Sequence, residues 1–141
     1  MHWGMRKFIV VVGLLTILGG AGYLVKAWTN FRVQARASKL NEDVENLFSA
    51  LQKYKEHVGS YPVGGNAEVA RALKGQNAKN VIILVGKKND LNEKGEFVDP
   101  WGTAFRIYFS DNGILVRSAG PNRRFDDSTT GVECDDYFRS N

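Results

Sequence analysis

The residues best suited to chemistry lie near the C-terminus, where acidic side chains gather in a short segment. Five acids fall within 11 positions, with no basic residue among them: Asp126, Asp127, Glu133, Asp135 and Asp136. Like charges this close repel one another unless a cation neutralises them. Carboxylates on a loop containing Gly and Ser suit Ca²⁺, although their spacing is not that of an EF-hand. The alternative is a solvated acidic tail whose charges pair with Arg123, Arg124 and Arg139.

Residues for catalysis are scarce. His57 is the only histidine outside the N-terminal arm, and at the end of an expected helix it complements the helix dipole. Cys134 has no second histidine to activate it, and a single cysteine cannot form an intramolecular disulfide. The sequence contains no nucleophile-elbow, phosphate-loop or zinc-protease motif. We therefore expect a protein that is not an enzyme.

The net charge of +4 on 141 residues is unevenly distributed. Residues 1–39 hold six bases and no acid, whereas residues 40–141 hold thirteen bases and fifteen acids. Within the basic arm, residues 8–25 form an uncharged, mostly apolar run of 18 residues between Lys7 and Lys26. As a helix this run is about 27 Å long, close to the thickness of a bilayer core. The sequence favours a retained membrane span over a cleaved signal peptide, and argues against a nucleic-acid-binding tail.

The span is expected to continue into a second, amphipathic helix over residues 26–60. Apolar residues recur there at helical spacing, as a stripe made of Leu40, Val44, Leu47, Phe48, Leu51, Tyr54 and Val58. Gly59 and Pro62 mark the end of this helix. Together the two parts predict one helix of about 50 residues, and the stripe predicts packing against the region that follows, residues 61–141.

Shorter elements are expected in residues 61–141. Asn66 is suited to cap a helix over residues 67–74, which Gly75 ends. The apolar run 81–85 is too short to distinguish a buried strand from a helical turn. Residues 104–110 and 114–118 flank an Asn-Gly pair, which predicts a β-hairpin.

A turn precedes the hairpin. Asp99-Pro100-Trp101-Gly102 combines a fixed φ at proline with the freedom of glycine, and so predicts a tight turn that delivers Trp101 to the core. An aromatic binding platform is the alternative. Tyr61-Pro62, after the long helix, is interpreted in the same way, as packing and a chain reversal.

These motifs together resemble a known family. The N-terminal helix followed by Gly59-Ser60-Tyr61-Pro62 resembles the start of type IV pilin-like proteins. Three further segments resemble the major pseudopilin of type II secretion: Gly95-Glu96, Asp99-Pro100-Trp101-Gly102-Thr103 with Phe105-Arg106-Ile107, and Ser118-Ala119-Gly120-Pro121-Asn122 with Phe125 and Asp135-Asp136. The resemblance covers most of residues 26–138 and is weakest at 76–92.

The resemblance implies an α+β, pilin-like fold, in which a long helix with a membrane-spanning first half packs on a small antiparallel sheet. It implies a non-enzymatic subunit of a type II secretion or type IV pilus-like system that associates with other pilin-like subunits or secretion-system membrane proteins. It implies a single-pass protein in the bacterial inner membrane with its globular region in the periplasm. The basic residues that flank the span slightly favour the opposite orientation, with the globular region in the cytoplasm. A membrane-tethered periplasmic binding module that does not polymerise is the alternative.

The resemblance also implies a Ca²⁺ ion in the C-terminal loop. The family positions map here onto Asn122, Asp126, Asp127, Asp135 and Asp136, with the main-chain carbonyl of Ser118 as a further ligand. The sequence departs from the family in its signal, because the apolar run after Gly13 has no Glu at the fifth mature position. Processing by the family's peptidase is therefore not predicted.

Overall fold

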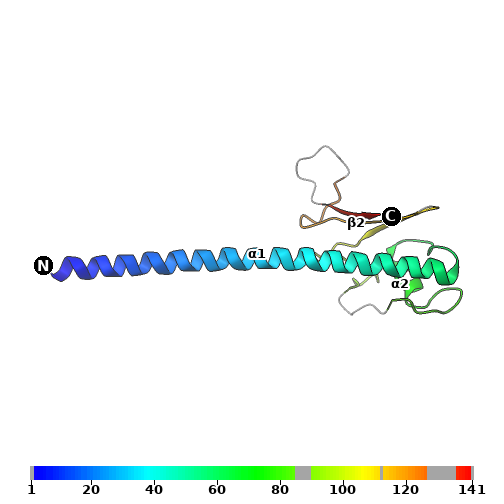
Figure 1. Ribbon diagram of the computed structural model, residues 1–141, viewed down its shortest axis with the longest axis horizontal. Coiled ribbons are helices and arrows are strands. Elements are labelled where there is room, and N and C mark those ends of the chain that lie inside the picture. The colour runs from blue at the N-terminus through cyan, green and yellow to red at the C-terminus, as the bar shows by residue number, and fades with distance from the viewer. Residues whose placement is uncertain (1, 85–89, 112, 127–135, 141) are drawn as a thin grey trace. The chain divides into compact units, whose positions relative to one another are not determined.

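The computed structural model describes residues 2–84, 90–111, 113–126 and 136–140, and the side chains of residues 2–23 lie outside its described part. The described residues form two helices and three strands in the order α1, α2, β1, β2, β3 (Figure 1). They are helix α1 (His2–Val58), helix α2 (Asn66–Leu73), and strands β1 (Arg106–Ser110), β2 (Gly113–Ser118) and β3 (Tyr137–Ser140). The chain divides into two compact units, Met1–Ala37 and Ser38–Asn141.

Helix α1 is the long helix expected from the sequence. It ends at Val58, and Gly59 follows with φ of 101°, a conformation that glycine adopts without strain. The Gly59 N–H donates to the carbonyl of Lys55 at 2.8 Å, which satisfies one of the last carbonyls of the helix. Among the helices whose side chains are described, none is long and apolar enough to cross a membrane. The side chains of residues 8–23, which make up most of the expected span, lie outside the described part of the structure.

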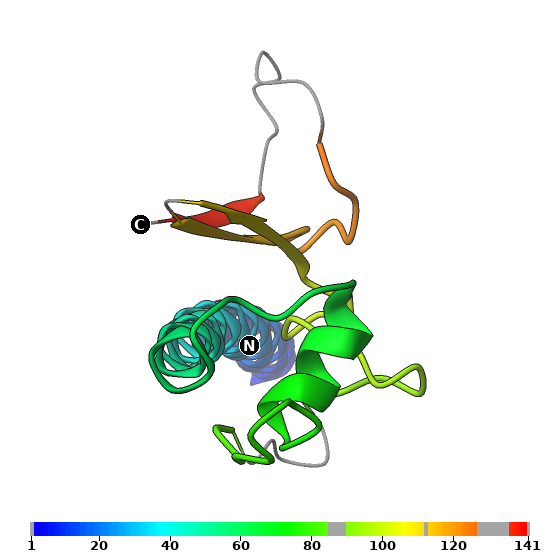
Figure 2. The same ribbon diagram turned by 90° about the vertical axis from the view of Figure 1, so that its right-hand side faces the viewer.

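The sheet has three antiparallel strands in the order β1-β2-β3. Strand β1 pairs with β2 so that Ser110 lies opposite Gly113, which confirms the expected hairpin. Strand β2 also pairs with β3, with Ser118 opposite Tyr137 and Arg117 opposite Phe138. The fold is therefore α+β, a long helix with a small antiparallel sheet. Figure 2 shows the strands as one layer, with α2 and the C-terminal part of α1 on the same side of it.

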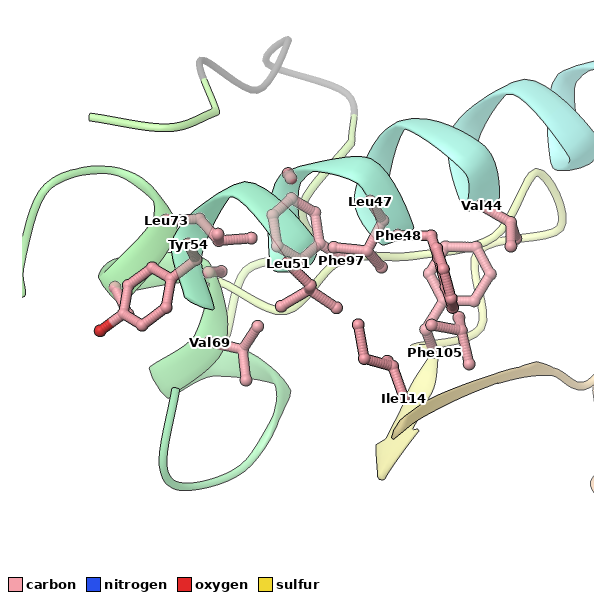
Figure 3. Packing of buried hydrophobic residues seen from close by; sticks show 14 of the residues in the cluster. Val44, Leu47, Phe48, Leu51, Tyr54, Val69, Leu73, Phe97, Phe105 and Ile114 are labelled. Carbon is pink, nitrogen blue, oxygen red and sulfur yellow. The ribbon is translucent and has the colours of Figure 1, made fainter. Parts of the chain in front are cut away.

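The core of the Ser38–Asn141 unit is built on the predicted stripe of α1. Its members Leu40, Val44 and Leu51 are at most 5 % exposed, and Val58 is partly buried at its end. Figure 3 shows side chains of this stripe facing Val69 and Leu73 of α2, Phe97 and Phe105 of the connecting segment, and Ile114 of β2. The other buried stripe members are Leu47, Phe48 and Tyr54. Because these side chains come from four separate segments, the core joins the helices to the sheet.

Two local expectations need correction. Gly65, not Asn66, is the N-cap of α2, and Asn66 is the first residue of that helix. The side chain of Asn66 instead bonds to the main chain of Phe97 and Phe105. The apolar run at 81–84 forms neither strand nor helix; the N–H groups of Ile83 and Leu84 donate to the carbonyl of Leu73. Val85 lies outside the described residues.

Candidate functional site

Three of the five expected calcium ligands lie together in the structure. The Nδ2 of Asn122 donates to Asp126 Oδ2 at 3.3 Å, and the main-chain N–H of Asp126 donates to Asp136 Oδ2 at 3.3 Å. Ser118, whose carbonyl was the further candidate, lies at the end of β2 opposite Tyr137. Asp127 and Asp135 lie outside the described residues. The described part of the loop is thus closed by contacts between its two ends.

Arg117 lies at the centre of this closure, and sequence reasoning missed it. Its Nε donates to Asp136 Oδ2 at 2.6 Å, and its Nη2 lies 2.5 Å from the same oxygen. Nη2 also donates to the main-chain carbonyl of Asp126. The side chain of Arg117 is 11 % exposed and that of Asp136 is 0 % exposed. Asp126 and Asp136, at the two ends of the loop, therefore both bond to the half-buried guanidinium of Arg117 from the middle strand.

Aromatic rings surround the same guanidinium. The Arg117 Cζ atom lies 5.3 Å from the ring centre of Phe125 and 5.0 Å from that of Phe138. Arg106, which is opposite Arg117 in the sheet, also contacts Phe125, and its Cζ atom lies 3.9 Å from the centre of that ring. Cation–π contacts of this kind are stronger where water is excluded. The rings hold Arg117 in place while they shield it from solvent.

The described residues do not fit a calcium ion as they are arranged. Calcium needs six to eight oxygen ligands, and the described residues contain no group of three or more His, Cys, Asp or Glu placed to hold a metal. Arg117 already holds Asp136 Oδ2, and Asn122 Oδ1 accepts the N–H of Arg124 at 2.6 Å. Asp136 Oδ1 is a buried oxygen without a hydrogen-bond partner. Because Asp127 and Asp135 are not described, calcium binding itself stays a prediction.

The alternative to calcium was a solvated tail whose acids pair with nearby arginines, and of these arginines Arg139 has a described ion pair. Arg139 bonds to Glu45 of α1, with Nε 2.6 Å from Oε1, and it lies 4.5 Å above the ring of Phe48. The hydrogen bond to Glu45 raises the pKa of Arg139 above its ordinary value, against a smaller opposing effect of desolvation. Arg123 and Arg124 are exposed. Arg139 thus links β3 to the long helix.

The turn at Asp99 is hydrogen-bonded to the end of β2. Asp99 is 3 % exposed, and its Oδ1 accepts the N–H groups of Trp101 at 3.0 Å and Thr103 at 2.9 Å. Its Oδ2 accepts the hydroxyl of Ser118 at 2.8 Å. Trp101 packs against the core, as the structural interpretation of the motif predicted. The turn is therefore joined to the strand end from which the acidic loop departs.

Of the two residues considered for catalysis, His57 is the one that the structure describes. His57 is exposed, and its Nδ1 lies 2.8 Å from the carbonyl of Lys53 in its own helix. This is the position expected of a histidine at a helix end. Cys134 lies outside the described residues.

No protein-family model and no curated protein matches the chain. Among solved structures, the chain is similar to the major pseudopilin from the type 2 secretion system of enterohaemorrhagic Escherichia coli. The match has 22 % sequence identity and a TM-score of 0.43, and it covers 78 % of this chain and 90 % of that one. The chain resembles a pseudopilin.

Proposed function

We propose that the protein is a non-enzymatic, pilin-like structural subunit of a type II secretion or type IV pilus-like system. One observation carries the proposal: a 57-residue helix buries one stripe of its C-terminal part in a small α+β domain. A helix of this length far exceeds what the core needs, because the buried stripe begins only at Leu40. The remainder is available for a membrane and for neighbouring subunits.

The region of α1 just before the core supports contacts with neighbours. Its large apolar side chains are at least 64 % exposed: Leu24, Val25, Trp28, Phe31 and Val33. An exposed apolar surface of this kind is typical of a protein or membrane contact. We propose that other pilin-like subunits pack against this part of α1.

The membrane anchor is the second part of the proposal. Residues 8–25 are long enough to span a bilayer, and basic residues flank them on both sides. Trp28, with Arg32 5.1 Å from its ring centre, suits the interface between lipid and water. We place the protein in the bacterial inner membrane with the Ser38–Asn141 unit in the periplasm, where the secretion system would use it.

Alkaline extraction of membranes tests the anchor. We expect the full chain to stay in the membrane pellet, and Leu14→Arg with Leu18→Arg to release most of it, because each charge at a span centre costs about 3 kcal/mol. The matched control is Ser38→Arg with Asn41→Arg, which adds the same charges at exposed positions of α1 outside the span. Release of the unaltered chain would contradict the anchor.

The mass of the extracted protein tests the same point independently. A retained span predicts a mature chain that still contains residues 8–25. A chain that starts after Gly22 would identify a cleaved signal peptide and remove the anchor from the account. A chain that keeps Met1 without N-methylation would show that the family's usual processing does not operate here.

A further inference from the structure

Asp136 is a carboxylate that needs a cation. Its side chain is 0 % exposed, and it directly precedes β3. An ionised carboxylate without solvent is strongly unfavourable unless a positive group and hydrogen bonds compensate it. The nature of this cation decides how the C-terminal loop is closed. This question rests on the proposed pilin-like function in that the resemblance to pilin-like proteins, together with the cluster of acids, is why calcium was expected.

Arg117 supplies the positive charge within the fold. Two of its nitrogens lie 2.5 and 2.6 Å from Asp136 Oδ2, and one of them also donates to the main chain of Asp126. The pairing of β2 with β3 places Arg117 opposite Phe138, two positions after Asp136, so the register of the sheet brings the two partners together. A planar guanidinium with several donors suits such convergent acceptors better than an ammonium group does.

The surrounding charges argue against a second, divalent cation at this place. Arg106 lies opposite Arg117 in the sheet and shares the ring of Phe125 with it, and both Arg123 and Arg124 belong to the loop. Four arginines thus lie near Asp126 or Asp136, either in the sequence or through the contacts of Arg117. A calcium ion would lie near a guanidinium that already holds one of its expected carboxylates, and the two positive charges would repel.

We propose that Arg117 is the built-in cation of this loop and takes the place that calcium was expected to fill. The loop is then ordered by the chain itself, through Asp136 and the main chain of Asp126, and its stability is independent of calcium. Arg117 is thus a positioning residue, which fixes Asp126 and Asp136 at the two ends of the loop against β2 and β3.

Thermal unfolding of the full chain in detergent tests the inference. The background Trp3→Phe with Trp28→Phe leaves Trp101 as the remaining tryptophan of the three, so its fluorescence reports on the Ser38–Asn141 unit. We expect the same melting temperature in EDTA and in millimolar calcium. We expect Arg117→Gln to lower it by about 10 °C or more in both conditions, because the buried Asp136 then lacks a partner.

Two further variants sharpen the comparison. Arg124→Gln removes an exposed arginine of the same loop and should shift the melting temperature by no more than about 2 °C. Arg117→Lys keeps the positive charge but loses the planar set of guanidinium donors. Its melting temperature should lie between those of the wild type and Arg117→Gln.

Either of two outcomes would overturn the inference. EDTA lowering the melting temperature of the unaltered chain, with recovery in calcium, would assign the loop to calcium. This comparison needs no substitution of Arg117, so it holds even if Arg117→Gln fails to fold. Arg117→Gln melting like Arg124→Gln would show that Arg117 does not close the loop. The extraction and mass experiments are unaffected by either outcome, so the proposed function is tested separately.

Discussion

Replacing Asp99 with alanine is expected to lower the free energy of unfolding by about 4 kcal/mol. The carboxylate is buried and accepts three hydrogen bonds, from the N–H groups of Trp101 and Thr103 and from the hydroxyl of Ser118. Alanine leaves all three donors without this acceptor, and Ser118 itself is 0 % exposed. A buried donor left unsatisfied costs about 1–3 kcal/mol.

The matched variant is Asp99→Asn, which keeps the shape and one acceptor oxygen. That oxygen serves Trp101 and Thr103, and the amide nitrogen can donate to the Ser118 hydroxyl oxygen. We expect a cost of about 1 kcal/mol, measured with Asp99→Ala by urea unfolding followed through Trp101 fluorescence. Equal effects of the two variants would mean that the negative charge, rather than the hydrogen-bond pattern, stabilises the turn.

The second large effect is expected from Asn66→Ala, which should cost about 3 kcal/mol. The Asn66 Nδ2 donates to the carbonyls of Phe97 at 2.9 Å and Phe105 at 2.8 Å, and its Oδ1 accepts the Phe97 N–H at 2.7 Å. These three bonds join the start of α2 to the two segments that lead into the sheet. The substitution therefore removes this link between α2 and the segments that lead into the sheet. It leaves the Phe97 N–H and the Phe105 carbonyl without their Asn66 partner, whereas the Phe97 carbonyl still accepts the Phe105 N–H at 3.0 Å.

Two comparisons test this interpretation of Asn66. Asn66→Asp keeps the acceptor but cannot donate to either carbonyl, so we expect it to be at least as destabilising as alanine. Asn41→Ala removes an exposed asparagine from α1 and should leave stability within about 0.5 kcal/mol. Urea unfolding measures all three. If Asn66→Asp matches the wild type, the two donated bonds do not matter for stability.

The parts of the fold that sequence predicted are those set by neighbouring residues. The stripe that begins at Leu40, the end of α1 at Gly59 and the hairpin after Ser110 each follow from spacing or a turn signal within a few positions. The turn at Asp99 likewise depends on four successive residues. Local periodicity and glycine conformation are properties of a short segment, so they are available before the chain is folded.

The contacts that sequence did not predict join residues far apart in the chain. Asn66 bonds to Phe97 and Phe105, which lie 31 and 39 positions further along the chain. Arg139 bonds to Glu45, which lies 94 positions before it. Arg117 pairs with Asp136 across 19 positions through the register of β2 and β3. In the sequence Arg117 occupies an ordinary polar position of a strand. Nothing in its local pattern distinguishes a solvated arginine from a buried one.

Under the proposed function, copies of this chain pack against one another through the exposed apolar side chains of α1. A photoreactive benzoylphenylalanine at Phe31, whose side chain is 67 % exposed, tests it in the native membrane. In a filament each subunit contacts the next through two different surfaces, so one photoreactive site per chain can link many subunits in succession.

We predict a ladder of products after irradiation, at multiples of the 15.7 kDa chain. An excess of the unaltered chain should shorten this ladder, because it separates the photoreactive copies. A single dimer band would indicate a closed two-fold contact. Monomer alone, with the protein still in the membrane pellet, would contradict the account and favour a tethered module that does not polymerise.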